Sequence, residues 1–243
     1  MKNKFKDLNL LEIQILNKKA AYTLAEVLIT LGIIGVVAAI TLSTVINNIQ
    51  GRQLQTALKK SYSTINQALD MYYVENGERY VKSDQAGILK QILMKYIKNV
   101  KDCGRGTGNK DCIYAYNRSY DTFNDIYKNF NGTNIIQSIY FDDGQFIIND
   151  GSLVMIEDEL STIRNRKYIS IDINGYKKRP NRLGQDVFMF QIMTDGKLLP
   201  MGADGTNYPQ KSYCSLTSTD QMNGAGCTVK ALSDKDFFKN LPK

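Results

Sequence analysis

Histidine and tryptophan are both absent from the 243-residue sequence. Without histidine, the chain has neither a Ser-His-Asp triad nor a Cys-His pair for nucleophilic catalysis, and histidine-rich metal sites are excluded as well. No pair of carboxylates falls in a pattern that indicates a catalytic cleft. The sequence therefore predicts a protein that is not an enzyme.

Strong charge of either sign is also missing. The formal net charge is +7, and the basic residues do not form a cluster interleaved with stacking aromatic side chains. No nucleic-acid partner is evident from this pattern. A mean hydropathy of -0.31 indicates that the chain is polar outside any apolar run. Its length suffices for one domain and an extended element.

Cysteine is scarce, with four residues that fall into two local pairs, Cys103 with Cys112 and Cys214 with Cys227. An even number in local pairs indicates two disulfides formed in an oxidising compartment. A zinc site is the second interpretation, although the close two-residue pairs typical of such sites are missing. Free thiols are the third.

No proline occurs between Tyr22 and Glu78, and this stretch holds the one long apolar run of the chain. The run covers residues 22 to about 46, and Glu26 is its only charge. About 20 apolar residues suffice to cross a bilayer, and the preceding Lys18 and Lys19 predict that this end stays in the cytoplasm. We therefore expect residues 1–21 to be a cytoplasmic leader and residues 22–46 to span the inner membrane once.

Glu26 is out of place in such a segment. An ionised carboxylate inside a bilayer costs about 3 kcal/mol even on lenient insertion scales, so an acid at this depth indicates function. The alternative is a carboxylate near the interface that reaches the headgroups. If the chain began at Tyr22, its free α-amine would be a natural partner for Glu26, in the same chain or a neighbouring one.

The apolar pattern continues past the predicted span, but on one side only. Residues 47–77 carry an apolar stripe with spacings of three and four, typical of an amphipathic helix, made of Leu54, Leu58, Tyr62, Ile65, Leu69 and Tyr72. Asn76-Gly77 is a typical helix end. One helix is therefore predicted from about Thr23 to Glu75.

Residues 78–243 are predicted to form a globular α+β head. A second helix is expected over residues 85–100, followed by short segments of period two that indicate strands. These are residues 135–141, 145–148, 152–156, 167–173, 187–193 and 197–199. The fold class is thus α+β, in which the long N-terminal helix packs on an antiparallel sheet of five or six strands. The strand at 167–173 alternates and is expected to be half-buried.

One loop of the head carries oxygen ligands at short spacing. Asp172 and Asn174 precede a glycine, and Asp186 with Asn181 follows some residues later. Oxygen donors in this pattern are candidate ligands for Ca²⁺, although the loop is not an EF-hand. The alternative is a structural loop in which Asp and Asn side chains cap turns. No cofactor is required, and calcium is the one candidate.

The N-terminal pattern resembles that of the type IV pilin and type II secretion pseudopilin superfamily. The match covers residues 18–46 and combines the basic flank, the position of Glu26 and the apolar length. The resemblance implies cleavage by a prepilin peptidase between Ala21 and Tyr22, and N-methylation of Tyr22. It implies that Glu26 neutralises the α-amine of an adjacent subunit during assembly. The implied partners are like subunits, the peptidase and an inner-membrane assembly platform, with the head on the periplasmic or extracellular side.

The sequence departs from the family pattern at three positions. Ala21 stands where glycine usually precedes the cleaved bond, and Tyr22 where phenylalanine usually follows it. Ser43 stands where many members carry a proline. In the head, the loop from Asp172 to Phe188 and the Cys214 and Cys227 pair resemble bacterial prepilin-type proteins assigned to type II protein secretion. Some pseudopilin heads hold calcium in a loop.

Two other classes of protein fit parts of the sequence. Val37-Ala38-Ala39 matches the small residues before a signal-peptidase cut, so the chain could be a secreted or periplasmic binding protein cleaved near Ala39. Glu26 and the helix that continues beyond the run argue against this reading. The third class is a monomeric membrane-anchored protein that never polymerises.

Overall fold

The computed structural model describes residues 22–81, 87–105, 112, 126–159 and 166–242. The predicted leader, residues 1–21, lies outside them. The chain divides into two units, residues 1–47 and 48–243, and helix α2 (Leu24–Asn76) belongs to both. The long helix expected from about Thr23 to Glu75 is thereby confirmed, and it runs through Ser43 without a break.

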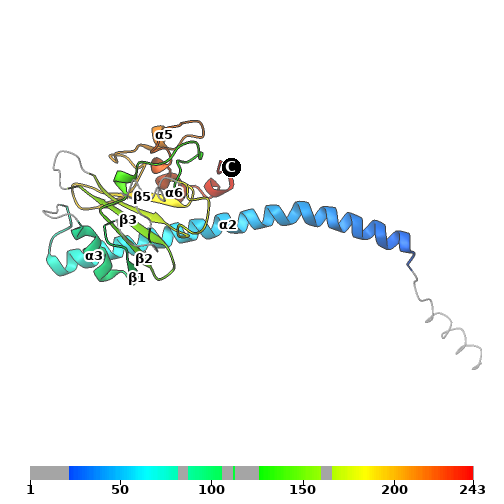
Figure 1. Cartoon of the computed structure of the whole chain (residues 1–243), viewed down its shortest axis with the longest axis horizontal. Helices are drawn as coiled ribbons and strands as arrows, with labels where there is room; N and C mark the ends of the chain where they lie inside the picture. Colours follow the sequence, from blue (N-terminus) through cyan, green and yellow to red (C-terminus); the bar gives the residue numbers. More distant parts are fainter. Residues whose placement is uncertain (1–21, 82–86, 106–111, 113–125, 160–165, 243) are drawn as a thin grey trace, which may run out of the picture. The chain divides into compact units, whose positions relative to one another are not determined.

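In the first unit, α2 is apolar on all sides. Residues 24–42 form a helix long and apolar enough to cross a membrane. Every residue from Tyr22 to Leu42 is exposed, and no atom outside the helix lies within 4 Å of a Cβ built on Gly32 or Gly35. The blue part of α2 in Figure 1 is this segment. It therefore has no packing partner in the described part of the chain.

The second unit is built on a six-stranded sheet in which all neighbouring strands are antiparallel and follow the chain order (Figure 1). The turn at residues 149–151 joins the second strand to the third, so the two pair as a hairpin. The strands are β1 (Asn99–Asp102), β2 (Gly144–Ile148), β3 (Leu153–Asp158), β4 (Lys167–Asp172), β5 (Val187–Ile192) and β6 (Leu198–Pro200).

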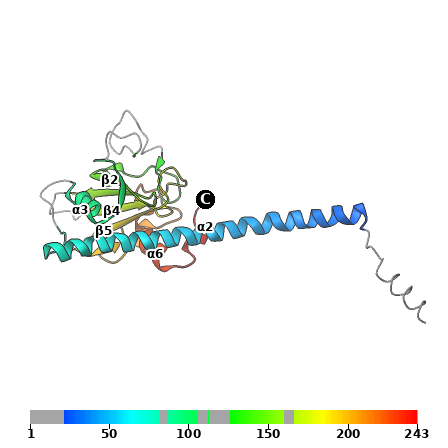
Figure 2. The same cartoon turned by 90° about the horizontal axis from the view of Figure 1, so that it is seen from below.

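Both faces of this sheet are covered, so side chains that alternate along a strand enter different cores. In β3, Val154 and Ile156 join the core that also contains the apolar stripe of α2, whereas Leu153 and Met155 join the other. The cyan part of α2 and the helix α3 (Ile88–Tyr96) lie on the first face (Figure 2).

Of the remaining short helices that the structure describes, one lies between β1 and β2 and the others follow β6. They are η1 (Ser138–Tyr140), α5 (Gln210–Tyr213), η2 (Ala225–Cys227), α6 (Thr228–Ser233) and η3 (Phe237–Lys239). Met201 and Met222 from the C-terminal third pack with Tyr127 in the second core. This covering layer explains why β4, expected to be half-buried, is buried at all six positions.

The helix predicted over residues 85–100 is shorter in the structure and ends at Tyr96. Ile97 is extended, and the Asn99 side chain donates to the carbonyls of Met94 (2.9 Å) and Ile97 (3.1 Å). These bonds satisfy acceptors that a helix end leaves open. The backbone then continues as β1, a strand that the sequence analysis did not predict.

The strand predicted over residues 135–141 is wrong. Ile135 makes an isolated bridge to Lys128, and residues 138–140 form η1, in which the Phe141 N–H donates to the Ser138 carbonyl at 3.0 Å. A short run of Ile, Tyr and Phe is compatible with either structure, because periodicity over so few residues does not separate them.

Candidate functional site

The start of α2 is fixed by two side chains that bond to each other's backbone. One carboxylate oxygen of Glu26 accepts the N–H of Thr23 at 2.8 Å and its hydroxyl at 2.8 Å. In return, the Thr23 hydroxyl oxygen accepts the Glu26 N–H at 3.2 Å. This reciprocal arrangement is a capping box, which satisfies N–H groups that would otherwise stay unpaired at a helix start.

The capping box brings Glu26 back to the residue that follows Tyr22. Tyr22 precedes the helix and is 79% exposed, while Ala21 lies outside the described residues. The sequence analysis named Glu26 and Tyr22 but missed Thr23. The pattern Thr-x-x-Glu before an apolar run was the signal that could have identified it.

Beyond the capping box, the apolar side chains of the first unit point to solvent in the isolated chain. Leu28, Ile34 and Val36 are each 62% exposed. Monomeric soluble proteins rarely expose a continuous apolar surface of this kind, which marks a membrane or protein contact. The segment can therefore be stable only in lipid or among other apolar helices.

All four cysteines form disulfides. Cys103 is joined to Cys112 and Cys214 to Cys227, as the sequence pairing predicted. No cysteine is free, so the zinc and free-thiol interpretations do not apply to this structure. Cys227 is fully buried in the core that contains the α2 stripe.

The loop after β4 is organised by the carboxylate of Asp172. One of its oxygens accepts the N–H groups of Gly175 (2.8 Å) and Asn174 (3.3 Å), and the other accepts the hydroxyl of Tyr127 (2.7 Å). Tyr127 is fully buried and was not singled out from the sequence. A carboxylate that ties its own loop together in this way has a structural role.

Asp186 holds the end of the same loop. Its carboxylate accepts the N–H groups of Arg182 (2.7 Å) and Asn181 (2.8 Å), and the Asn174 amide donates to it at 3.4 Å. The structure thus brings together the predicted residues Asp172, Asn174 and Asp186. Asn181 has a φ of 55°, a left-handed conformation that asparagine tolerates better than most residues.

Burial raises the pKa values of both carboxylates in this loop, Asp172 and Asp186. Burial, followed by the nearby Asp186, raises the pKa of Asp172 to about 7. Burial raises the pKa of Asp186 to about 6. Buried carboxylates without a cation favour their neutral form, so a bound cation would lower both pKa values.

Two asparagine side chains supply the evidence that bears on a cation. The amide oxygens of Asn174 and Asn181 are buried without a hydrogen-bond partner, and Asn181 is 5% exposed. Such oxygens fit a hard cation. However, every carboxylate oxygen of Asp172 and Asp186 already accepts a bond from the chain. Among the described residues, no group of three Asp, Glu, Cys or His side chains could hold a metal. The calcium site stays a prediction.

Comparisons with known proteins bear on the N-terminal site. Residues 16–42 match the family model of the prokaryotic N-terminal methylation motif. No curated protein and no solved structure matches the chain. The motif, together with the apolar helix, fits a processed protein of the prepilin type, similar to pilins and pseudopilins. Members of this motif family are structural subunits, and the motif implies processing by a prepilin peptidase and assembly with like subunits.

Proposed function

We propose that this chain is a structural subunit of a type IV pilus or of a type II secretion pseudopilus and has no catalytic activity. The observation that carries the proposal is the start of α2. There, Glu26 caps the helix beside Tyr22, and the apolar segment that follows has no partner in the described chain. A helix of this kind needs lipid before assembly and like helices after it.

The proposed processing has three steps. A prepilin peptidase cuts between Ala21 and Tyr22, the new α-amine of Tyr22 is methylated, and the platform in the inner membrane assembles the subunit. Glu26 then pairs with the α-amine of a neighbouring subunit. An ionised acid among apolar helices is unfavourable unless it is paired, so this pairing would select the register between subunits. The head lies on the periplasmic or extracellular side.

The N-terminus of the mature protein tests this processing. Mass spectrometry of the protein from its native membrane is expected to find a chain that begins with methylated Tyr22. A chain that begins at Ile40 would instead establish the secreted or periplasmic binding protein, with a signal peptide cleaved at Ala39.

Glu26→Gln separates the capping role of this residue from its charge. Glutamine keeps an oxygen that accepts from Thr23, so we expect the helix start and membrane insertion to persist. The charge that pairs with an amine is lost, so filament yield should fall at least about tenfold, since an unpaired charge in an apolar medium costs about 3 kcal/mol. Electron microscopy and shear fractions measure the yield.

Thr30→Val is the matched control for this experiment. The Thr30 hydroxyl bonds to the carbonyl of Glu26 at 2.9 Å in the same segment, and its replacement changes no charge. This variant is expected to assemble normally. Filaments of Glu26→Gln in normal amounts would refute the pairing role. Absence of filaments from the wild type would instead favour a monomeric membrane anchor.

Calcium binding by the head is a second, separate proposal, supported by the unpartnered amide oxygens of Asn174 and Asn181. Ligand that binds only the folded state raises stability by mass action. Millimolar calcium is therefore expected to raise the melting temperature of the wild type but not of Asp172→Asn, whose side chain keeps the shape and loses the charge. Equal melting temperatures of the wild type with and without calcium would end this proposal.

A further inference from the structure

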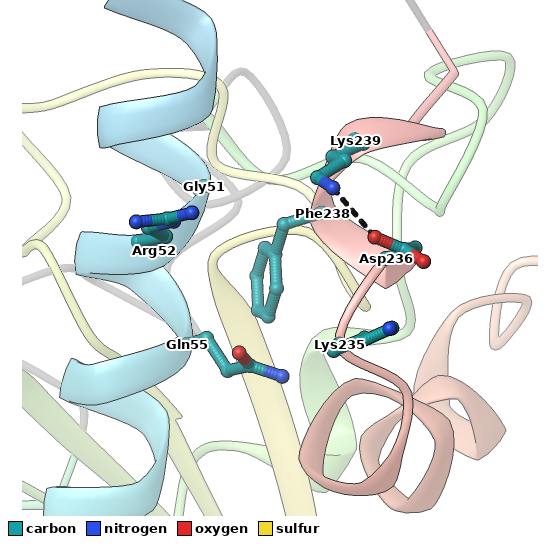
Figure 3. Close-up of a pocket in the computed structure, with 7 residues that line it drawn as sticks. All are labelled: Gly51, Arg52, Gln55, Lys235, Asp236, Phe238 and Lys239. Atoms are coloured by element: carbon teal, nitrogen blue, oxygen red, sulfur yellow. Dashed lines mark hydrogen bonds and ion pairs between the residues drawn. The ribbon is translucent and has the colours of Figure 1, made fainter.

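A pocket of about 300 Å³ opens in the second unit between α2 and the C-terminal segment (Figure 3). Neither the methylation motif nor the Asp172 loop includes any of its residues. The lining comes from two stretches far apart in the sequence, namely Gly51, Arg52 and Gln55 of α2 and Lys235, Asp236, Phe238 and Lys239.

The two stretches are held together by close packing. A Cβ built on Gly51 would lie 3.1 Å from the Cβ of Phe238, so glycine lets the C-terminal segment approach the helix backbone. Glycine inside a helix is disfavoured by about 1 kcal/mol, and this approach gives its presence a reason. The Gln55 amide also donates to the carbonyls of Ala231 (3.4 Å) and Asp234 (3.1 Å).

The pocket carries an excess of positive charge. Of its three cations, Lys239 is paired with Asp236 at 2.6 Å, the dashed contact in Figure 3. This bond lowers the pKa of Asp236, so the pair stays ionised at neutral pH. No carboxylate of the described residues forms an ion pair with Arg52 or Lys235. These two cations are therefore available to a ligand.

The chemistry of the lining suits a phosphate group that is attached to an apolar molecule. The planar guanidinium of arginine matches two phosphate oxygens at once, and lysine adds a flexible point charge. Phe238 lies among the cations in Figure 3 and lines the pocket. Most of this side chain packs in the core and it is 8% exposed, so the apolar surface that it offers is small. A phospholipid combines these two properties.

The position of Arg52 in the chain brings a membrane within reach. The segment that can cross a membrane ends at Leu42, ten residues before Arg52. Ten residues cover at most about 35 Å, even when fully extended. Basic side chains this near an anionic bilayer are attracted to its surface.

We propose that Arg52 and Lys235, beside the ion pair of Lys239 and Asp236, form a binding site for the phosphate of an anionic phospholipid. This site holds the head at the membrane surface while the subunit resides in the bilayer. The proposal rests on the membrane insertion proposed above, but not on assembly into a filament.

Native mass spectrometry of the full chain in detergent tests the site. Phosphatidylglycerol and phosphatidylcholine are offered in equal amounts, and the lipids retained are counted. The wild type is expected to retain phosphatidylglycerol about tenfold more, and Arg52→Gln with Lys235→Gln should abolish this preference. The control is Lys177→Gln with Lys178→Gln, two exposed lysines elsewhere on the head, which removes the same charge and should change nothing.

Three results would overturn the proposal. The pocket variant could keep the preference, or the control could lose it to the same extent, in which case net charge alone explains it. Glycerol phosphate could displace the lipid at equal concentration, which would make the ligand a soluble phosphate. Flotation with phosphatidylcholine vesicles measures insertion separately, so a failure there counts against the proposed function, whereas a failure of lipid preference counts against the pocket.

Discussion

Glu157 is the acidic side chain of the head whose surroundings oppose its charge most clearly. It lies in β3 and is 7% exposed. Burial, followed by the charges of Asp143, Asp142 and Glu159, raises its pKa to about 8. The nearby Asp142 has a pKa raised to about 6, again chiefly by burial.

The raised pKa of Glu157 predicts that stability falls as the pH rises. The unfolded chain releases this proton near pH 4.5, while the folded chain keeps it up to about pH 8. The folded state is therefore favoured most below about pH 4.5 and loses that advantage between the two values. Glu157→Gln removes the titrating group, so the variant should exceed the wild type in stability at pH 8 by on the order of 2 kcal/mol.

Chemical denaturation at pH 5, 6.5 and 8 measures this effect. The profile of Glu157→Gln should be flatter than that of the wild type. Glu78→Gln, at an exposed position, should leave the profile unchanged. Parallel profiles for the wild type and Glu157→Gln would show that the Glu157 carboxylate does not control the pH dependence.

Gly175 is needed for two independent reasons. Its φ of 78° is left-handed, and a Cβ at this position would lie 2.5 Å from the carbonyl oxygen of Gly151. Gly175→Ala should therefore lower the free energy of unfolding by about 3 kcal/mol, of which backbone strain supplies about 1–2 kcal/mol. Gly151→Ala is the matched control. The φ of Gly151 is 89°, so an alanine there is also strained, but no atom lies within 4 Å of a Cβ built at this position. Equal losses in urea unfolding would refute the clash.

At the scale of elements, the C-terminal third is held to the rest of the head by polar links, and a disulfide joins two of its own residues. The Thr228 hydroxyl accepts the N–H of Met189 in β5 at 3.1 Å. The carbonyl of Pro242 accepts from Arg182 and Gln185. The disulfide between Cys214 and Cys227 closes the loop that leads into α6.

Removal of this disulfide should destabilise the head. A closed loop of about 15 residues restricts the unfolded chain by about 3 kcal/mol. We expect Cys214→Ala with Cys227→Ala to lose about this amount, plus a contribution from the cavity at the fully buried Cys227. The disulfide between Cys103 and Cys112 closes a shorter loop, so Cys103→Ala with Cys112→Ala should lose less stability. Urea denaturation compares the two variants, and the reverse order would contradict the argument.

At the scale of the whole molecule, patterns along the chain predicted most elements, while contacts between distant residues were beyond them. The helix α2 was predicted because its apolar residues recur every three or four positions. The strands on either side of residues 149–151 were predicted because their apolar residues recur every second position. The strand β1 was missed because Asn99–Asp102 has no apolar alternation and is fixed by pairing with β2. The pocket around Arg52 was missed because it needs a segment that lies more than 180 residues further along.

The candidate sites show the same division. Glu26 stood out because a charge in an apolar run is visible in the sequence. Asp172 and Asp186 were correctly grouped, since glycine and asparagine between them indicate a turn. Tyr127, which donates to Asp172, gave no signal because it comes from a separate segment 45 residues away.

The capping box also determines what maturation changes. Thr23 and Glu26 themselves cap the N-terminal end of α2. The proposed cleavage before Tyr22 therefore leaves no additional backbone N–H unpaired in this helix. It converts a neutral amide into a cation at the positive end of a helix dipole, where a cation is unfavourable. Maturation would thus alter the charge of the helix end without altering its structure, and the carboxylate that offsets this charge is already in place in the precursor.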